Sequence, residues 1–269
     1  MLKPYPVLIL LLLSQANTAK SQNQPFAVFP SAIFKETFQA NVFGRDNRKK
    51  ITKLDYPWST IGYLESRLGC TATLVGKNLI LTAAHCLYGE ARTAPRKRPQ
   101  VPNESFFHLN ISDPKTATKS RIRNQKIVAG TQQPFQERTH DWALLELEDN
   151  LGETFGWMKM GDDTQGVLNI AGYPYERWDG KTLATDQCSI QEIVDGFLLH
   201  DCDSSMGMSG GPLFKIISSK EAKIVALHIA EYRHGALDTP SFRKYTAENA
   251  NVAIPLVEAL KAKERSFDK

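Results

Sequence analysis

Short apolar or alternating runs, separated by turn residues, recur along the chain from Trp58 onward. Runs of four to eight residues bounded by turns are typical of β-strands. Helical character is limited to one terminal segment, which follows Pro255 at the position where a helix tolerates proline. The pattern therefore predicts an all-β fold of two six-stranded antiparallel β-barrels with a C-terminal α-helix. The pattern marks six of these strands in the first half (58–64, 71–75, 79–82, 106–111, 122–128 and 142–147) and five in the second (167–173, 187–194, 197–201, 212–217 and 224–230), and the helix is 256–263.

The N-terminal pattern predicts export. Lys3 precedes an apolar run at 7–13 and then small residues, as in a signal peptide, and cleavage after Ala16 or after Ala19 fits equally well. The run is too short to span a bilayer, so we expect a secreted or periplasmic protein with no membrane anchor. The expected organisation is a signal peptide (1–19), a propeptide or N-terminal arm (20–41), an N-terminal barrel (42–155) and a C-terminal barrel (156–269).

Composition narrows the class of partner. The 269 residues are 42% apolar and carry a net charge of +4, which supports a packed core and does not indicate nucleic-acid binding. Basic residues concentrate in the loop 89–103, which reads as a solvated loop or as a patch for an acidic surface. Asn103 and Asn110 head glycosylation sequons that matter only in a eukaryotic source. We expect a monomer that acts on protein or peptide substrates.

Four cysteines in an exported chain predict two disulfides. Cys70 and Cys86 flank a turn at 76–78, and Cys188 and Cys202 flank Asp195-Gly196, a strong hairpin signal. Each pair would therefore meet across its own hairpin. Zinc is the alternative, but no two cysteines have the close spacing of a zinc site, and we expect no metal.

The stretch MGMSGGPLF at 206–214 is the strongest candidate for chemistry. Glycines around Ser209 allow a sharp turn that brings backbone N–H groups beside an exposed hydroxyl, as acyl transfer requires. The motif LTAAHC ends a predicted strand at His85, a candidate general base. The motif HDWALL places Asp141 at the start of another strand, where it could orient the histidine.

Taken together, these residues resemble the trypsin-like serine peptidases, whose His, Asp and Ser follow in this order along the chain. Within them the chain is most similar to the bacterial glutamyl endopeptidase (V8-like) branch. The resemblance implies a triad of His85, Asp141 and Ser209, an oxyanion hole from the N–H groups of Gly207 and Ser209, and a zymogen cut near Asn41 or Val42. The matching motifs are VFGRDNR (42–48), CTATLVG (70–76), AGYP (171–174) and LH (227–228).

Two positions depart from trypsin. Met208 stands where trypsin has the aspartate that captures the new N-terminus on activation, so maturation must work differently. Ile229 stands where trypsin supports the triad acid with a serine hydroxyl, so Asp141 needs another partner.

The residues expected to select the substrate point in two directions. His228 matches the histidine that helps glutamyl endopeptidases to bind an acidic side chain, and a histidine–carboxylate contact is a strong hydrogen bond. Asp203 lies near the position at which trypsin holds the acid that binds Arg or Lys, and Glu231 could add negative charge. Asp203 could instead accept backbone hydrogen bonds or pair with His228. The residue preferred before the cut stays open.

The sequence thus predicts an exported serine endopeptidase that works through an acyl-enzyme without a cofactor. The rival from another class is an inactive protease-like protein that docks through its basic loop, against which the complete triad argues. Gly207-Met208-Ser209-Gly210-Gly211 also fits the nucleophile elbow of α/β-hydrolases, with Glu221 and His228 or His234 as partners. That fold requires a helix after the serine, whereas the residues from Pro212 onward read as a strand.

Overall fold

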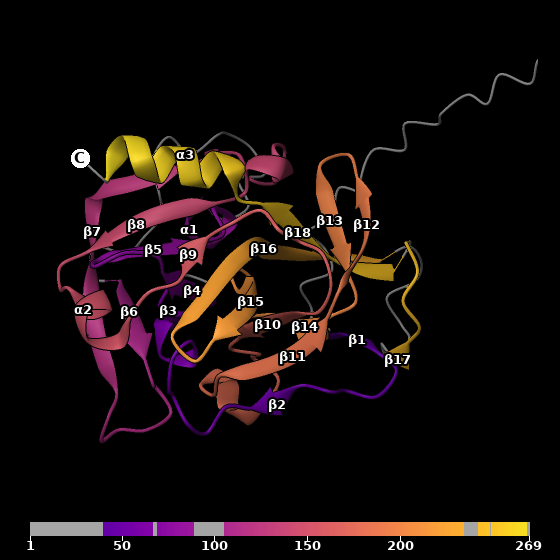
Figure 1. The fold of residues 1–269 in the computed structure, drawn as a ribbon, viewed down its shortest axis with the longest axis horizontal. Helices are drawn as coiled ribbons and strands as arrows, with labels where there is room; N and C mark the ends of the chain where they lie inside the picture. Colours follow the sequence, from indigo (N-terminus) through magenta and orange to yellow (C-terminus); the bar gives the residue numbers. More distant parts are fainter. Residues whose placement is uncertain (1–39, 67–68, 89–104, 234–241, 248, 268–269) are drawn as a thin grey trace, which may run out of the picture. The chain divides into compact units, whose positions relative to one another are not determined.

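The computed structural model describes residues 40–66, 69–88, 105–233, 242–247 and 249–267 (Figure 1). The expected signal peptide, most of the expected propeptide, the basic loop 89–103 and His234 lie outside these residues. Among the described residues, no helix combines the length and apolar character needed to cross a membrane.

The first group of strands forms a closed barrel, as predicted. Its hydrogen-bonded order is β3-β4-β5-β8-β7-β6, and each pair is antiparallel. Every residue of β4 and β5 is buried, because the barrel interior covers one face and neighbouring elements cover the other. The bounds are β3 Ile61–Leu64, β4 Cys70–Leu74, β5 Leu79–Thr82, β6 Phe106–Leu109, β7 Thr118–Ala129 and β8 Ala143–Leu147.

The second group forms a nine-stranded sheet of order β12-β13-β18-β16-β15-β10-β11-β2, with β9 paired to β16. Its outer strands β12 and β2 do not pair with each other, so the predicted closure of a second barrel is not confirmed. The sequence pattern missed β18, a buried strand whose asparagine residues interrupt the apolar run. The bounds are β2 Lys49–Lys50, β9 Lys159–Met160, β10 Leu168–Gly172, β11 Ala184–Cys188, β12 Ile190–Val194, β13 Phe197–His200, β15 Pro212–Ser218, β16 Glu221–Arg233 and β18 Asn249–Pro255.

A small third sheet attaches the N-terminal segment to the second half of the chain. β1 (Ala40–Phe43) pairs antiparallel with β14 (Ser204–Ser205) and parallel with β17 (Phe242–Arg243). β2 pairs with β11 of the nine-stranded sheet. Within residues 42–50, expected with the N-terminal barrel, β1 and β2 thus pair with strands of the second half of the chain, and short polar strands carry no signal of which sheet they join.

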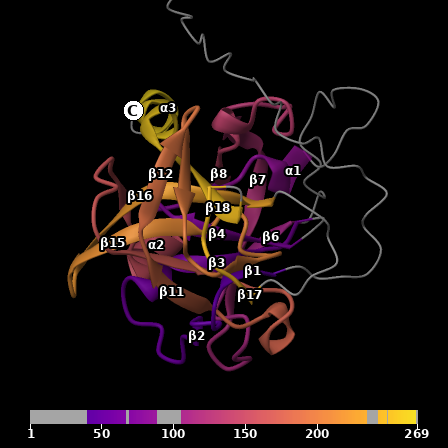
Figure 2. The same ribbon diagram turned by 90° about the vertical axis from the view of Figure 1, so that its right-hand side faces the viewer.

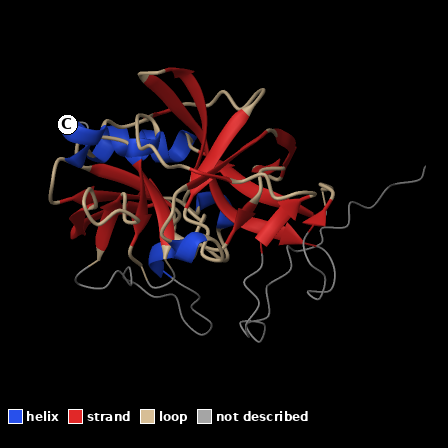
Figure 3. Ribbon diagram, turned by 90° about the horizontal axis from the view of Figure 1, so that it is seen from below, coloured by secondary structure: helices blue, strands red, loops and turns tan. Residues whose placement is uncertain are grey.

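Helices are few among the residues that the structure describes (Figure 3). They are α1 (His85–Tyr88), α2 (Leu151–Phe155) and α3 (Val257–Ser266), with short 3-10 turns at η2 (Trp58–Thr60), η3 (Arg138–His140) and η4 (Trp178–Gly180). The predicted C-terminal helix is confirmed with slightly shifted bounds. It buries Ala259 and Ala262 and packs against β8, so the end of the chain returns to the first barrel (Figures 1 and 2).

Both predicted disulfides are confirmed. Cys70–Cys86 joins the start of β4 to α1, and Cys188–Cys202 joins the end of β11 to the residues before β14. Each closes a loop of similar length, with sequence separations of 16 and 14 residues.

Candidate active site

Strand register brings the candidate base and acid together. β5 pairs antiparallel with β8 so that Thr82, its last residue, lies opposite Ala143, the first residue of β8. His85 follows the end of β5 and Asp141 precedes the start of β8, so both side chains lie at the same edge of the barrel. The Nδ1 of His85 lies 2.7 Å from Oδ2 of Asp141, and the His85 backbone N–H donates to Oδ1 at 2.8 Å. Asp141 thus accepts two hydrogen bonds from one residue and fixes both its backbone and its ring.

Arg138 supplies charge support for the buried acid. Asp141 is 3% exposed, and Ile229 is buried without offering a hydroxyl. Burial lowers the pKa of Arg138, while electrostatic attraction to Asp141 and Glu231 opposes that shift. The expectation that Asp141 draws support from elsewhere is met by Arg138, which sequence reasoning missed because a basic residue before a strand resembles any surface charge.

Backbone geometry around Ser209 requires its glycines. Gly207 and Gly210 have φ angles of +94° and +79°, in the left-handed region that favours glycine. A Cβ on Gly207 would lie 2.3 Å from the carbonyl oxygen of Tyr173, and one on Gly210 would lie 2.3 Å from Oγ1 of Thr82. Glycine at 207 and 210 therefore allows the backbone conformation that leaves Ser209 partly exposed, and a larger residue at either position would clash.

Two peptide groups are held so that their N–H groups stay unpaired. The carbonyl of Met206 accepts from the Tyr175 N–H at 2.8 Å, and the carbonyl of Met208 accepts from the Gly211 N–H at 2.9 Å. A trans peptide points its N–H away from its C=O, so these bonds fix the directions of the Gly207 and Ser209 N–H groups. Neither of these two N–H groups donates to any residue that the structure describes. They are the donors expected to bind an oxyanion.

Thr71 of β4 connects the first barrel to the Ser209 loop. Its N–H donates to the Ser209 carbonyl at 2.9 Å, and its Oγ1 donates to the Gly207 carbonyl at 2.8 Å. The Sγ of Cys86, next to His85, lies 3.9 Å from the Ser209 carbonyl oxygen. These contacts bring the Ser209 loop against β4 and against the cysteine that follows His85. Thr71 was missed because a threonine in a strand carries no chemical signal.

Asp203 faces the N-terminal segment. Its Oδ1 accepts from the Phe43 N–H at 2.8 Å and its Oδ2 from the Asn47 N–H at 2.7 Å. It is 1% exposed, and burial outweighs these two hydrogen bonds and raises its pKa to about 6. Of the roles considered for Asp203, backbone binding is the one that the structure supports. Both oxygens are occupied, which argues against a contact with a basic substrate side chain.

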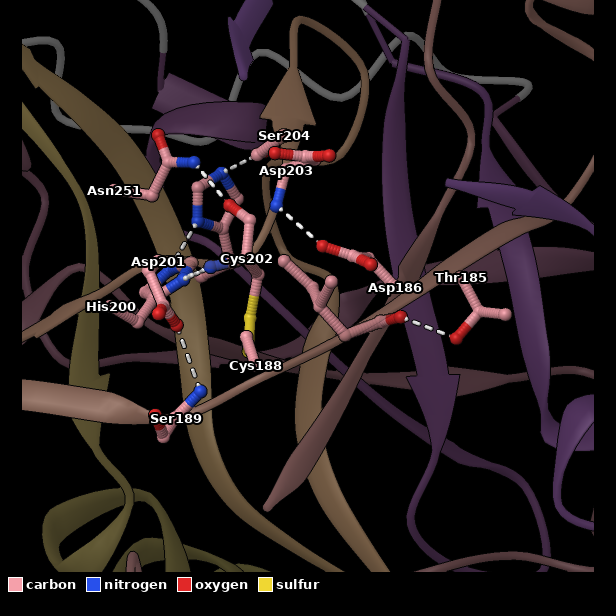
Figure 4. The surroundings of a disulfide bond; sticks show 12 residues. Thr185, Asp186, Cys188, Ser189, His200, Asp201, Cys202, Asp203, Ser204 and Asn251 are labelled. Atoms are coloured by element: carbon pink, nitrogen blue, oxygen red, sulfur yellow. Dashed lines mark hydrogen bonds between the residues drawn. A yellow bond between two sulfur atoms is a disulfide. The ribbon is translucent and has the colours of Figure 1, made fainter. Parts of the chain in front are cut away.

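His228 belongs to a buried chain of hydrogen bonds, of which Figure 4 labels Ser204, His200 and Cys202. Its Nε2 lies 2.7 Å from Oγ of Ser204, and its Nδ1 lies 3.2 Å from Nε2 of His200. The His200 Nδ1 accepts from the Cys202 N–H at 3.3 Å. The suggested pairing of His228 with Asp203 is absent from the hydrogen bonds of the described residues; Ser204 takes that place. Both His228 and Ser204 are fully buried.

Two cysteine–histidine groups resemble metal sites in their proximity alone. They are Cys70, Cys86 and His85, and Cys188, Cys202 and His200. In each group both cysteines form a disulfide, so neither offers the thiolate that a metal would bind.

Comparison with known proteins places this geometry in context. The model of the family described as Trypsin matches residues 45–248. Glutamyl endopeptidase of Bacillus licheniformis is 24% identical over 221 residues, which is 77% of this chain and 65% of that protein. Serine protease 23 of Homo sapiens is 28% identical over 205 residues, covering 64% of this chain and 50% of that protein. The chain thus spans between half and two thirds of the length of these relatives.

A solved structure of a Glu endopeptidase in complex with MPD superposes with a TM-score of 0.64. It is 21% identical, and the match covers 83% of this chain and 97% of that one. At this identity the likeness shows a shared chymotrypsin-like fold, and it agrees with the strand after Ser209 in rejecting the α/β-hydrolase alternative.

Proposed function

Because this chain belongs to the trypsin family, we propose that it is a serine endopeptidase that works through an acyl-enzyme. The observation that carries the proposal is the meeting of the His85–Asp141 pair with the Ser209 loop, whose two N–H groups are held unpaired. Such an arrangement provides a base, an orienting acid, a nucleophile and oxyanion donors in one site.

The proposed reaction follows from these positions. The Ser209 hydroxyl attacks the substrate carbonyl carbon while Nε2 of His85 takes its proton. The carbonyl oxygen becomes negative and is stabilised by the Gly207 and Ser209 N–H groups. His85 then gives the proton to the leaving amine, and water hydrolyses the ester by the same steps. Asp141 keeps the His85 proton on Nδ1 and stabilises the imidazolium. These steps use no cofactor.

For the substrate, we propose a preference for an acidic residue before the cut. His228 and Ser204 are the candidate contacts for the acidic side chain. The hydrogen bonds of Asp203 to backbone N–H groups argue against its use in binding Arg or Lys. The similarity to a protein named glutamyl endopeptidase agrees with this choice. Since His228 and Ser204 are fully buried, access requires a rearrangement near β1, whose Asn41 lies opposite Ser204.

A peptide library varied only at the residue before the cut tests the preference. We expect cleavage after Glu or Asp and its loss in His228→Phe, with esters of small side chains still hydrolysed. Strong cleavage after Arg or Lys that disappears in Asp203→Ala would contradict the acidic preference.

Export and maturation complete the proposal. The predicted signal peptide agrees with two disulfides, which persist in oxidising compartments. We propose a secreted or periplasmic monomer that is processed near Asn41.

The rival function is that of an inactive binding protein, whose basic loop lies outside the described residues. A fluorophosphonate probe separates the two, because it attaches to an activated serine. We expect labelling of Ser209, no labelling in Ser209→Ala, and a loss of peptidase turnover of about 10⁶-fold in that variant. Absence of labelling in the processed wild-type protein would favour the inactive protein.

A further inference from the structure

A partly buried ion cluster outside the triad joins the N-terminal segment to the Ser209 loop. At its centre is Arg48, which is 6% exposed. Its guanidinium donates from Nη1 to Oγ of Ser205 at 2.8 Å and from Nη2 to Oε1 of Glu176 at 2.6 Å. Nε and Nη2 also donate to the two carboxylate oxygens of Asp46 at 3.1 and 2.9 Å. All three nitrogens of one side chain are thereby engaged.

The members of the cluster also bind one another. Oγ of Ser205 donates to Oε2 of Glu176 at 2.5 Å, and Nη1 of Arg177 donates to Oδ2 of Asp46 at 2.7 Å. Burial alone would raise the pKa of Asp46, but its bonds to Arg48 lower that pKa below the ordinary value. Removal of Arg48 would take away the guanidinium that Asp46, Glu176 and Ser205 share.

These contacts fall on both sides of the peptide that carries the Gly207 N–H. Glu176 follows Tyr175, whose N–H holds the Met206 carbonyl. Ser205 precedes Met206, and its carbonyl accepts the Met208 N–H at 3.0 Å. Arg48 thus binds Glu176, which follows Tyr175, and Ser205, which precedes Met206. It therefore holds one residue on each side of the Met206–Gly207 peptide.

The N-terminal segment that bears Arg48 is itself anchored. Asp203 binds the N–H groups of Phe43 and Asn47, and β1 pairs with Ser204 and Ser205. A displacement of residues 43–48 would therefore reach the Ser209 loop through defined bonds. In trypsin an aspartate before the nucleophile connects the N-terminus to this loop, and here that position is the uncharged Met208.

We propose that Arg48 is a positioning residue that keeps the oxyanion hole formed, by holding Glu176 and Ser205 on either side of the Met206–Gly207 peptide. The proposal rests on the proposed peptidase function. It assigns to residues 46–48 the connection between the N-terminal segment and the oxyanion loop that Met208 cannot make.

The kinetic test compares Arg48→Met with two further variants. Arg48→Met/Glu176→Gln also removes the carboxylate that would lose its cation, and so guards against a failure to fold. Arg48→Lys keeps the positive charge but not the planar guanidinium that makes several hydrogen bonds. Lys53→Met is the matched control, because the Lys53–Asp55 pair is solvent-exposed at 83% and 66%. Activities are normalised to the concentration of active sites measured with a fluorophosphonate.

We expect Arg48→Met and the double variant to lose about 10- to 100-fold in kcat with KM changed less than about 3-fold. Displacing one oxyanion donor should cost less than removing it, which costs about 10²- to 10³-fold. A peptide aldehyde, whose adduct places an oxyanion in the same hole, should lose affinity by the same factor as kcat/KM. Arg48→Lys should lie between, and Lys53→Met should match wild type. Folded variants with wild-type kcat would overturn the proposal.

Amide hydrogen exchange tests the connection without activity. In the Ser209→Ala background, Arg48→Met should speed exchange at Tyr175, whose N–H binds Met206, by about 10-fold or more, while the Lys53→Met control leaves it unchanged. Unchanged exchange at Tyr175 would overturn the proposal. If the wild-type enzyme proved inactive toward peptides, the proposed function would fail, whereas the exchange result would still decide whether Arg48 holds this loop.

Discussion

At the scale of single residues, Asp203 is a buried carboxyl group with a raised pKa. Burial raises its pKa to about 6, above the ordinary value of 3.8. At a pH between these two pKa values, Asp203 holds more of its proton in the folded protein than in the unfolded chain. Its contribution to stability therefore falls as the pH rises from about 4 to about 6. The change is on the order of 3 kcal/mol, at about 1.4 kcal/mol for each pKa unit.

This pH dependence is measured by urea unfolding across pH 4–7 in the Ser209→Ala background, with Asp203→Asn as the reference. The difference in unfolding free energy between the two proteins should decline toward pH 6 and then level off. A difference that stays constant over this range would show that Asp203 titrates normally.

His228 should occupy one tautomer, which is set by its hydrogen bond to His200 and by the bond of His200 to Cys202. The Cys202 N–H donates to Nδ1 of His200, so the His200 proton lies on Nε2 and points at Nδ1 of His228. Burial lowers the pKa of His200 well below its ordinary value, which keeps it neutral. Neutral His228 therefore carries its proton on Nε2, toward Ser204.

Long-range ¹H–¹⁵N spectra of histidine-labelled Ser209→Ala protein report this tautomer. We expect the Nε2–H form for His228, and a mixture of forms in His200→Phe, which removes the donor to Nδ1. An Nδ1–H form of His228 in the otherwise unchanged chain would reverse the proposed direction of these hydrogen bonds.

At the scale of elements, the two disulfides hold different parts of the site. Cys70–Cys86 joins α1, which carries His85, to β4, whose Thr71 binds the Ser209 loop. Cys188–Cys202 adjoins Asp203 and Ser204 instead. Because the loops are of similar length, replacing either pair by alanines should cost about 3 kcal/mol.

Their effects on activity should differ. Loss of Cys70–Cys86 should mainly lower kcat, since it loosens the base, while loss of Cys188–Cys202 should mainly raise KM. Denaturant unfolding and steady-state kinetics on both double variants separate stability from function. Equal effects on kcat would refute this division.

At the scale of the whole molecule, the N-terminal segment connects the expected maturation point to the site. Asn41 is fully buried, its Nδ2 donates to Oδ1 of Asn251 at 3.0 Å, and its carbonyl accepts from Asn251 at 3.1 Å. Removing Asn41 would leave Oδ1 of the buried Asn251 without its donor, although Nδ2 of Asn251 would keep its bond to the Cys202 carbonyl, and an unpaired buried acceptor costs about 1–3 kcal/mol. Of the two expected starts, the structure thus favours Asn41 over Val42.

N-terminal sequencing of the active enzyme measures the start directly. We expect Asn41 or a residue shortly before it, and Asn41→Ala should lower the thermal stability of the processed protein. A start at Asn17 or Lys20 would show that no pro-segment is removed.

The sequence by itself determined the features that depend on local chemistry. Alternation and turn residues located the strands of the first barrel, hairpin symmetry paired the cysteines, and glycine spacing marked Ser209. His85 and Asp141 could be named because each lies at a predicted strand end, where the chain presents a side chain at an edge.

Only the tertiary structure decided which distant groups meet. It bound Asp203 to the backbone of the N-terminal segment, which was one of the alternatives left open, and it placed Ser204 beside His228. It did not confirm closure of the second sheet, and it paired residues 40–43 and 49–50 with strands of the second half of the chain. The physical reason is that a charged or polar side chain looks the same in sequence whether it faces water or a buried partner. Its role is set by burial and by hydrogen-bond partners that can lie far along the chain, as Phe43 and Asn47 lie 160 and 156 residues from Asp203.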